Sequence, residues 1–233
     1  MFILHLIYIS HNNAITTIMQ GKRPLTDSEI QIIAKKGFRG RYAARDRCIF
    51  HVGWTTGFRC SEIRQLRIYN VYGSHSVLSE ITAEANTTKG TAAGNVKKTL
   101  QPAREAIEKW IEKRETIYYI PSKSDDYKAW RQSYLFPSQR EGCLSVKQVW
   151  VILKTAFARA GVEGAVATHS LRKTYAKKAY YNYLKRYRDG KTDTEPMRLL
   201  QLALGHKHID TTYRYMSFIS EEIDEEAFTL NAL

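Results

Sequence analysis

The spacing of hydrophobic positions near the start of the chain indicates helices. From residue 25 onward, apolar residues recur every three or four positions, which is the period of an amphipathic helix. Thr26 and Glu29 have the T-x-x-E spacing of a capping box, so a helix is predicted to begin there. Its buried face should carry Ile30, Ile33 and Ala34.

Two further helices are predicted soon afterwards. One covers about residues 42–55, with Ile49 and Val52 at helical spacing, and Gly57 is expected to end it. The next begins at Ser61.

The period of the pattern changes between about residues 66 and 100. Residues 77–82 and 96–100 alternate as strands do, and they flank the turn-like, glycine-containing segment 88–95. A small antiparallel sheet is therefore predicted in this part of the chain.

Helical periodicity returns at Pro102, a residue type that is tolerated in the first turn of a helix. Residues 122–140 are polar and irregular, and further helices are predicted over 145–160 and from about Thr168 onward. The predicted fold class is α+β, a mainly α-helical domain with a small antiparallel β-sheet near its first third.

Charge narrows the choice of partners. The 233 residues suit one domain, and 36 Lys and Arg against 23 Asp and Glu leave a net charge of +13. Such an excess favours a polyanion, because each phosphate contact releases condensed counterions. Charge by itself leaves open a protein that is merely basic.

Cysteine usage and hydropathy bear on the compartment. Cys48, Cys60 and Cys143 are far apart and form no C-x-x-C pair, which argues against a disulfide framework and for a reducing cytoplasm. The apolar opening MFILHLIYI lacks a basic flank and a cleavage site and is too short to span a bilayer. A cytoplasmic protein without membrane partners is expected.

Three segments and one tyrosine carry candidate chemistry. They are residues 56–62 with Arg59, 168–172 with His169 and Arg172, 204–206 with His206, and Tyr215 nine residues later. Cutting a phosphodiester without a metal requires an oxygen nucleophile, cations for the phosphoryl oxygens and a proton donor for the leaving oxygen. Arginine forks suit a phosphate, and His169 and Arg172 share one face of a helix.

Each of these residues also has a purely structural interpretation. Arg59 is spaced to pair with Glu62, His169 to lie at a helix start, and His206 to be a buried structural imidazole. His206 and His208 invite a metal, but no cysteine or carboxylate cluster stands at ligand spacing, so neither a metal nor another cofactor is expected.

Taken together, the T-G-x-R-x-S-E, H-x-L-R and L-G-H segments and the terminal tyrosine closely resemble the tyrosine recombinase (phage integrase) family over about residues 25–220. The resemblance implies a site-specific recombinase or integrase that cuts and rejoins DNA through a 3′-phosphotyrosyl intermediate without metal or ATP. Residues two apart on a helix point to nearly opposite sides, and the family register selects Tyr215 rather than Tyr213 as the nucleophile.

The resemblance also implies a catalytic lysine at the turn of a β-hairpin, where it acts as a general acid. Lys89 fits that place best, and it completes a predicted set with Arg59, His169, Arg172, His206 and Tyr215. Lys97 and Lys98 lie beyond the turn, where contact with phosphates or solvent is expected.

A basic tract runs from Arg172 to Lys191, with eight basic residues, one acid and five interleaved tyrosines. It is interpreted as a DNA-tracking face with aromatic packing behind it, and Lys173, Lys177 and Lys178 are its predicted DNA contacts. A solvated helix face is the open alternative for any single lysine.

The predicted organisation is an apolar leader and linker (1–24), a catalytic domain (25–219) and an acidic tail (220–233). Acidic tails are often simply solvated, but the resemblance implies that this one docks on a neighbouring protomer. The resemblance implies double-stranded DNA as partner, a tetramer on DNA, a monomer or weak dimer in its absence, and accessory DNA-bending or directionality proteins. Most family members carry a separate helical DNA-binding domain before the catalytic one. Here only about 25 residues precede the first helix of the catalytic domain, so that half of the clamp is expected to be missing.

Two alternatives stand beside the recombinase. A type IB topoisomerase shares the chemistry, and an accessory DNA-binding protein could retain the fold without catalysis. A pure binder needs no nucleophile, so the joint presence of the six candidate residues favours an enzyme.

Overall fold

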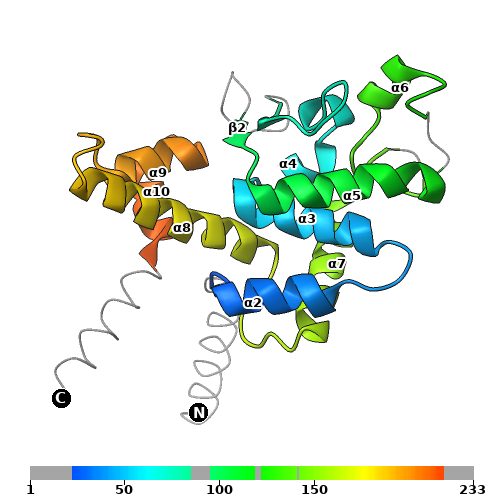
Figure 1. Cartoon of the computed structure of the whole chain (residues 1–233). Coiled ribbons are helices and arrows are strands. Elements are labelled where there is room, and N and C mark those ends of the chain that lie inside the picture. The colour runs from blue at the N-terminus through cyan, green and yellow to red at the C-terminus, as the bar shows by residue number, and fades with distance from the viewer. Residues whose placement is uncertain (1–22, 85–94, 119–121, 141, 218–233) are drawn as a thin grey trace, which may run out of the picture.

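A computed structural model describes residues 23–84, 95–118, 122–140 and 142–217 of the chain (Figure 1). The described part is mostly helical, with a two-stranded antiparallel sheet, as predicted. Its elements are α2 (Asp27–Ile32), the π-helix η1 (Ile33–Gly37), α3 (Ala43–Thr56), α4 (Cys60–Gln65), the 3-10 helix η2 (Ile68–Asn70), β1 (Glu80–Ala83), β2 (Asn95–Lys98), α5 (Gln101–Ile117), α6 (Tyr127–Gln132), α7 (Val146–Arg159), α8 (Thr168–Arg188), α9 (Pro196–Leu204) and α10 (Ile209–Tyr215).

The predicted capping box at the start of α2 is confirmed. The Glu29 amide donates to Thr26 Oγ1 at 3.2 Å, and the Thr26 amide donates to Glu29 Oε2 at 2.9 Å. These two bonds satisfy amides that the first turn of a helix leaves without partners. Ile30 and Ile33 are buried beneath this turn, as the sequence pattern predicts.

Gly57 ends α3, also as predicted, and the structure adds a second reason for glycine there. Its φ of 67° lies in the left-handed region, and a Cβ at this position would meet Cδ1 of Tyr175 at 2.3 Å. The close approach lets the end of α3 pack directly against α8.

The two strands of the sheet are shorter than predicted, and the first begins later. β1 pairs with β2 from Glu80↔Lys98 to Ala83↔Asn95, whereas Val77 bridges Tyr72 outside the sheet. The polar stretch 122–140 was predicted to be irregular throughout, but it contains α6. That short helix forms because Asp126 caps it, its Oδ1 accepting from the Ala129 amide at 2.8 Å, and because it buries Trp130.

Two hydrophobic clusters make up the interior of the described residues. The larger, which we call the main core, lies among α3, α4, α5 and α7 and includes Phe50, Trp110 and Phe157. The smaller, which we call the second core, joins Ala176 of α8 to residues of α9 and the end of α10, namely Met197, Leu200, Leu204 and Met216. In Figure 1, α8, α9 and α10 gather on one side of the molecule, and α8 packs on α3 as well as on α9.

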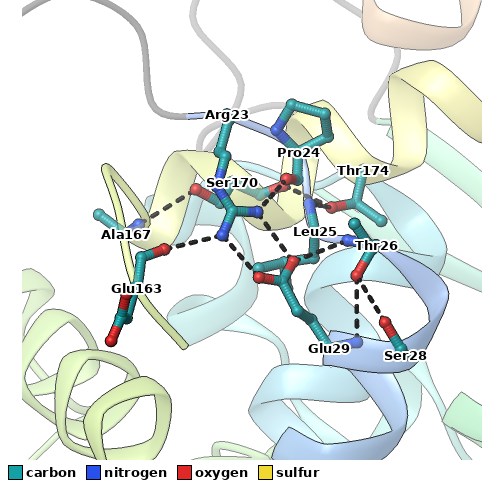
Figure 2. Close-up of polar contacts among 10 residues, drawn as sticks. All are labelled: Arg23, Pro24, Leu25, Thr26, Ser28, Glu29, Glu163, Ala167, Ser170 and Thr174. Atoms are coloured by element: carbon teal, nitrogen blue, oxygen red, sulfur yellow. Dashed lines mark hydrogen bonds and ion pairs between the residues drawn. The ribbon is translucent and has the colours of Figure 1, made fainter. Parts of the chain in front are cut away.

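The chain preceding α2 is bound to the start of α8 (Figure 2). The Leu25 amide donates to Thr174 Oγ1 at 2.8 Å, and Arg23 donates to the carbonyl of Glu163 at 2.7 Å while pairing with Glu29 at 2.5 Å. The first two turns of α8, which carry His169 and Arg172, are therefore held from outside as well as by the main core. Among the described residues, no helix combines the length and the apolar character needed to cross a membrane.

Candidate active site

Four of the six predicted catalytic residues converge, and they come from four places in the chain. Arg59 immediately precedes α4, Arg172 lies on α8, His206 follows α9, and Tyr215 is the last residue of α10. The rings of His206 and Tyr215 meet edge to face with their centroids 5.6 Å apart. Arg172 Nη2 lies 3.5 Å from His206 Nε2. Residues separated by more than 150 positions thus share one site.

Arg172 is the buried centre of this cluster, with 3% of its surface exposed. Its guanidinium donates to the Gly57 carbonyl at 2.5 Å and to the Leu204 carbonyl at 2.6 Å. Both acceptors are neutral, although Leu204 lies at the C-terminal end of α9, where the helix dipole favours a cation. No ion pair links Arg172 to a carboxylate within the described ranges, and burial lowers its pKa.

Arg59 makes the ion pair with Glu62 that its spacing predicts. Nη1 lies 3.0 Å from Oε1 of Glu62, whose carboxylate is buried. Because the side chain of Arg59 is still 34% exposed, its outer edge remains accessible from solvent. Its positive charge also lowers the pKa of His206 and of Tyr215, which places it within electrostatic reach of both.

His206 is held by contacts at both ring nitrogens. Nδ1 lies 3.0 Å from Thr212 Oγ1, and Nε2 faces Arg172. Burial, and then the charges of Arg172 and Arg59, lower the pKa of His206 to about 4. The imidazole is consequently neutral at physiological pH.

Tyr215 turns toward the cluster and Tyr213 turns away from it. Tyr213 is 54% exposed, whereas the Tyr215 hydroxyl is buried and has no hydrogen-bond partner in the part of the chain that is described. Burial raises the pKa of Tyr215 to about 12, against the opposing effect of Arg172 and Arg59. The phenol is therefore protonated in the free protein, and its oxygen lies beside two guanidinium groups.

The two remaining members of the predicted set are less closely defined. His169 lies in the first turn of α8, three residues before Arg172, and is exposed. Lys89 falls outside the described residues.

The two lysines of β2 differ from each other. Lys98 is exposed, as expected of a residue that contacts phosphates or solvent. Lys97 instead is only 9% exposed; its ammonium donates to the Ala203 carbonyl near the end of α9 and lies 5.8 Å from the ring centroid of Tyr175. Burial, and then the charge of Arg172, lower the pKa of Lys97 to about 8. The prediction that Lys97 contacts phosphates or solvent is therefore wrong, because its side chain is buried against α9.

The three lysines of α8 that were predicted to contact DNA lie in different surroundings. Lys173 Nζ lies 5.9 Å from the ring centroid of Tyr215, and Lys177 is half-buried. Lys178 forms an ion pair with Asp27 and lies over Trp54. Aromatic packing behind this helix is confirmed for Tyr175, Tyr180 and Tyr183, which pack on the second core.

Thr212 is the residue in this cluster that sequence reasoning missed. A threonine three positions before a tyrosine carries no chemical signal, and its contact with His206 exists only because the chain turns between α9 and α10. Among the described residues, no group of three or more His, Cys, Asp or Glu is placed to hold a metal ion.

Comparison with known proteins gives one family. Residues 24–221 match the Phage integrase family. Among curated relatives, the chain is 26% identical over 200 residues to "Tyrosine recombinase XerD" of Lacticaseibacillus casei, covering 85% of this chain and 59% of the relative. It is 28% identical over 201 residues to "Type 1 fimbriae regulatory protein FimE" of Escherichia coli K12, covering 84% and 86%.

The chain thus spans 59% of that XerD protein, and 51% of the XerD protein of Corynebacterium glutamicum. Among solved structures, its fold is similar to that of the XerH site-specific recombinase bound to a palindromic difH substrate. The TM-score is 0.61 at 22% sequence identity, over 88% of this chain and 52% of that one. At 22% sequence identity, this comparison shows a similar fold and nothing more.

Proposed function

The chain belongs to the phage integrase family, and on that premise we propose that it is a site-specific DNA recombinase that cuts and rejoins DNA through a 3′-phosphotyrosyl intermediate. One observation carries the proposal. The buried guanidinium of Arg172, bonded only to neutral groups within the described residues, lies in one cluster with the unpartnered hydroxyl of Tyr215 and the neutral ring of His206.

A phosphate diester supplies what this cluster lacks. A buried charge without a counter-ion is unfavourable, and a phosphodiester anion would compensate Arg172 while accepting paired hydrogen bonds from it and from Arg59. The same two cations would stabilise the charge that develops on the phosphoryl oxygens during attack. In the free protein their charges already oppose the effect of burial on the pKa of Tyr215, which is about 12.

In the proposed step, Oη of Tyr215 attacks phosphorus and forms a P–O bond while the bond from phosphorus to the 5′ oxygen breaks. The phenol loses its proton, and the 5′ oxygen gains one. We assign the phenol proton to His169, because His206 with a pKa of about 4 is too weak a base. We assign the proton for the 5′ oxygen to Lys89, as the family resemblance implies. Attack by a second 5′ hydroxyl reverses the step, so no ATP is needed.

The proposed partner is double-stranded DNA, consistent with the net charge of +13. We further propose that exchange takes place in a tetramer on DNA, in which residues 220–233 dock on a neighbouring protomer, with DNA-bending or directionality proteins as accessories. The DNA of the cytoplasm or nucleoid would be the place of action.

Covalent capture tests the proposal without knowledge of the DNA site. The protein is incubated with a pool of nicked duplexes of random sequence, and adducts that resist SDS are isolated and their DNA sequenced. We expect adducts enriched in one sequence, formed equally well after removal of divalent cations.

Tyr215→Phe should abolish the adduct, since it removes the attacking oxygen. Tyr213→Phe is the matched control, because it makes the same chemical change on the exposed side of the same helix, and it should retain the adduct. Failure of the wild type to form any adduct would refute the proposal that the protein is a recombinase. An adduct that survives Tyr215→Phe but is lost in Tyr213→Phe would refute the choice of nucleophile.

A further inference from the structure

His206 receives a different kind of partner at each ring nitrogen. The group facing Nε2 is the guanidinium of Arg172, which can only donate hydrogen bonds. Nε2 must therefore present its lone pair in the free protein. Since the ring is neutral, its single proton is on Nδ1, which donates it to Thr212 Oγ1 over 3.0 Å.

The hydroxyl of Thr212 contacts the His206 ring from a buried position. Its side chain is fully buried, so water does not replace its hydroxyl. It lies three residues before Tyr215 on α10, and residues at this spacing share a helix face. One turn of α10 therefore carries both the proposed nucleophile and the group that orients His206.

When a phosphate binds, Nε2 must donate a hydrogen bond, whereas in the free protein it presents a lone pair. The oxygens of a phosphodiester anion carry no proton and only accept hydrogen bonds, so a neutral His206 that contacts one must carry its proton on Nε2 and a lone pair on Nδ1. A hydroxyl can serve both states, because it rotates to accept from Nδ1–H or to donate to bare Nδ1. A carbonyl or an ammonium group at the position of Thr212 Oγ1 could serve only one.

We propose that Thr212 is a positioning residue whose hydroxyl reverses its hydrogen bond when phosphate enters, which allows His206 to change from the Nδ1–H to the Nε2–H tautomer and donate to the phosphate. This inference rests on the proposed function. The change conserves charge: Nδ1 releases one proton to solvent and Nε2 takes one up, so the imidazole is neutral before and after.

Nitrogen-15 NMR of the imidazoles tests the tautomers directly, with His206→Asn used to assign the signal. We expect the Nδ1–H form in the free protein and a shift toward Nε2–H when dimethyl phosphate, a phosphodiester anion without a P–OH group, is added. The matched variants are Thr212→Val, which removes the buried hydroxyl at nearly constant shape, and Thr211→Val, which makes the same change one residue away. The phosphate-induced shift should be lost in the first variant, kept in the second and restored in Thr212→Ser.

Cleavage supplies the second readout, with the nicked duplexes recovered by covalent capture. Complete loss of one acid–base or hydrogen-bonding group costs roughly 100- to 10,000-fold in rate. Thr212→Val keeps the imidazole and only loosens it, so a loss of about tenfold to a hundredfold is expected, with Thr212→Ser close to wild type.

Two results would overturn the inference: an Nε2–H tautomer in the free protein, or a Thr212→Val variant that matches Thr211→Val in both tautomer and rate. If wild-type His206 shows both tautomers as described but no duplex is ever cut, the recombinase proposal is what fails, and a role for Thr212 in catalysis falls with it.

Discussion

Gly57 meets two demands at once, and no other residue type meets both. Its φ of 67° is unfavourable for residues with a Cβ, and the space where a Cβ would lie is filled by the Tyr175 ring. Its carbonyl in addition accepts a hydrogen bond from Arg172. A change at this glycine should therefore affect stability and the site together.

Gly57→Ala is expected to lower the free energy of unfolding by about 3 kcal/mol, with roughly 1–2 from the backbone and the rest from overpacking against Tyr175. Gly40→Ala is the control, because Gly40 has a similar φ of 78° and open space around it, so only the backbone part should appear. Urea denaturation measures both. Equal losses in the two variants would mean that the contact with Tyr175 is unimportant.

Two histidines make stability depend on pH. Burial lowers the pKa of both His51 and His206 to about 4, so between pH 6.5 and 5 the unfolded chain takes up protons that the folded chain does not. The free energy of unfolding should consequently fall as pH is lowered through this range. His51→Gln, measured by denaturation at several pH values, should show a shallower fall. An unchanged slope would contradict the burial of His51 in neutral form.

At the scale of elements, β2 and α9 are joined by a buried cation. Lys97 occupies the inward-facing position of β2 opposite Ile81, and its ammonium caps a carbonyl in the last turn of α9. Arg172 binds the next carbonyl along, that of Leu204. The end of the helix that precedes His206 is thus held by two cations from two different elements.

The lowered pKa of Lys97 should make the free energy of unfolding depend on pH. In the unfolded chain the pKa is near 10.5, and in the folded protein it is about 8, so between these values the unfolded state holds a proton that the folded state has released. The wild type should therefore gain stability relative to Lys97→Met as pH rises from 8 to 9.5, by at most about 1 kcal/mol per pH unit.

Lys98→Met is the matched control for that measurement, because Lys98 is the exposed neighbour on the same strand, and no such relative gain is expected for it. Denaturation midpoints of the three proteins across this pH range provide the comparison. If the denaturation midpoints of the two variants changed with pH in the same way, the side chain of Lys97 would be exposed to solvent and not buried.

At the scale of the whole molecule, the site lies where the two cores meet. The main core supports Arg59, whereas the second core supports the elements that carry His206 and Tyr215. Arg172 bridges them, with one hydrogen bond to the carbonyl of Gly57 at the end of α3 and another to that of Leu204 at the end of α9. The relative position of nucleophile and phosphate-binding groups therefore depends on this bridge.

Arg172→Lys should loosen α9 and α10 without unfolding the rest. A lysine cannot make both bonds of the fork, and loss of one charged hydrogen bond costs about 1.5–3 kcal/mol. Amide hydrogen exchange in α9 and α10 should accelerate by about tenfold or more, while α3 and α5 keep their protection. Arg186→Lys, an exposed change on the same helix, should alter neither. Uniform acceleration across the molecule would show that the two cores open together.

Much of the secondary structure could be read from local patterns. The capping box of α2, Gly57 after α3 and the helix that begins at Thr168 depend on neighbours within a few residues, and all three were predictable. α6 was missed because its apolar contribution is mainly one tryptophan, whose burial depends on distant partners such as Tyr72.

The candidate site divides in the same way. Sequence alone sufficed to nominate Arg59, Arg172, His206 and Tyr215, because their segments resemble the family's motifs. Helical spacing indicates that only one of Tyr213 and Tyr215 can face the cluster, and the family register selects Tyr215. Three-dimensional packing was needed to show that Val96 faces outward and Lys97 inward, the reverse of what their polarity suggests. It was needed equally for the Thr212 contact and for the neutral state of His206. The physical reason is that burial, charge proximity and hydrogen-bond pairing are properties of neighbours in space, which residues remote in the chain supply.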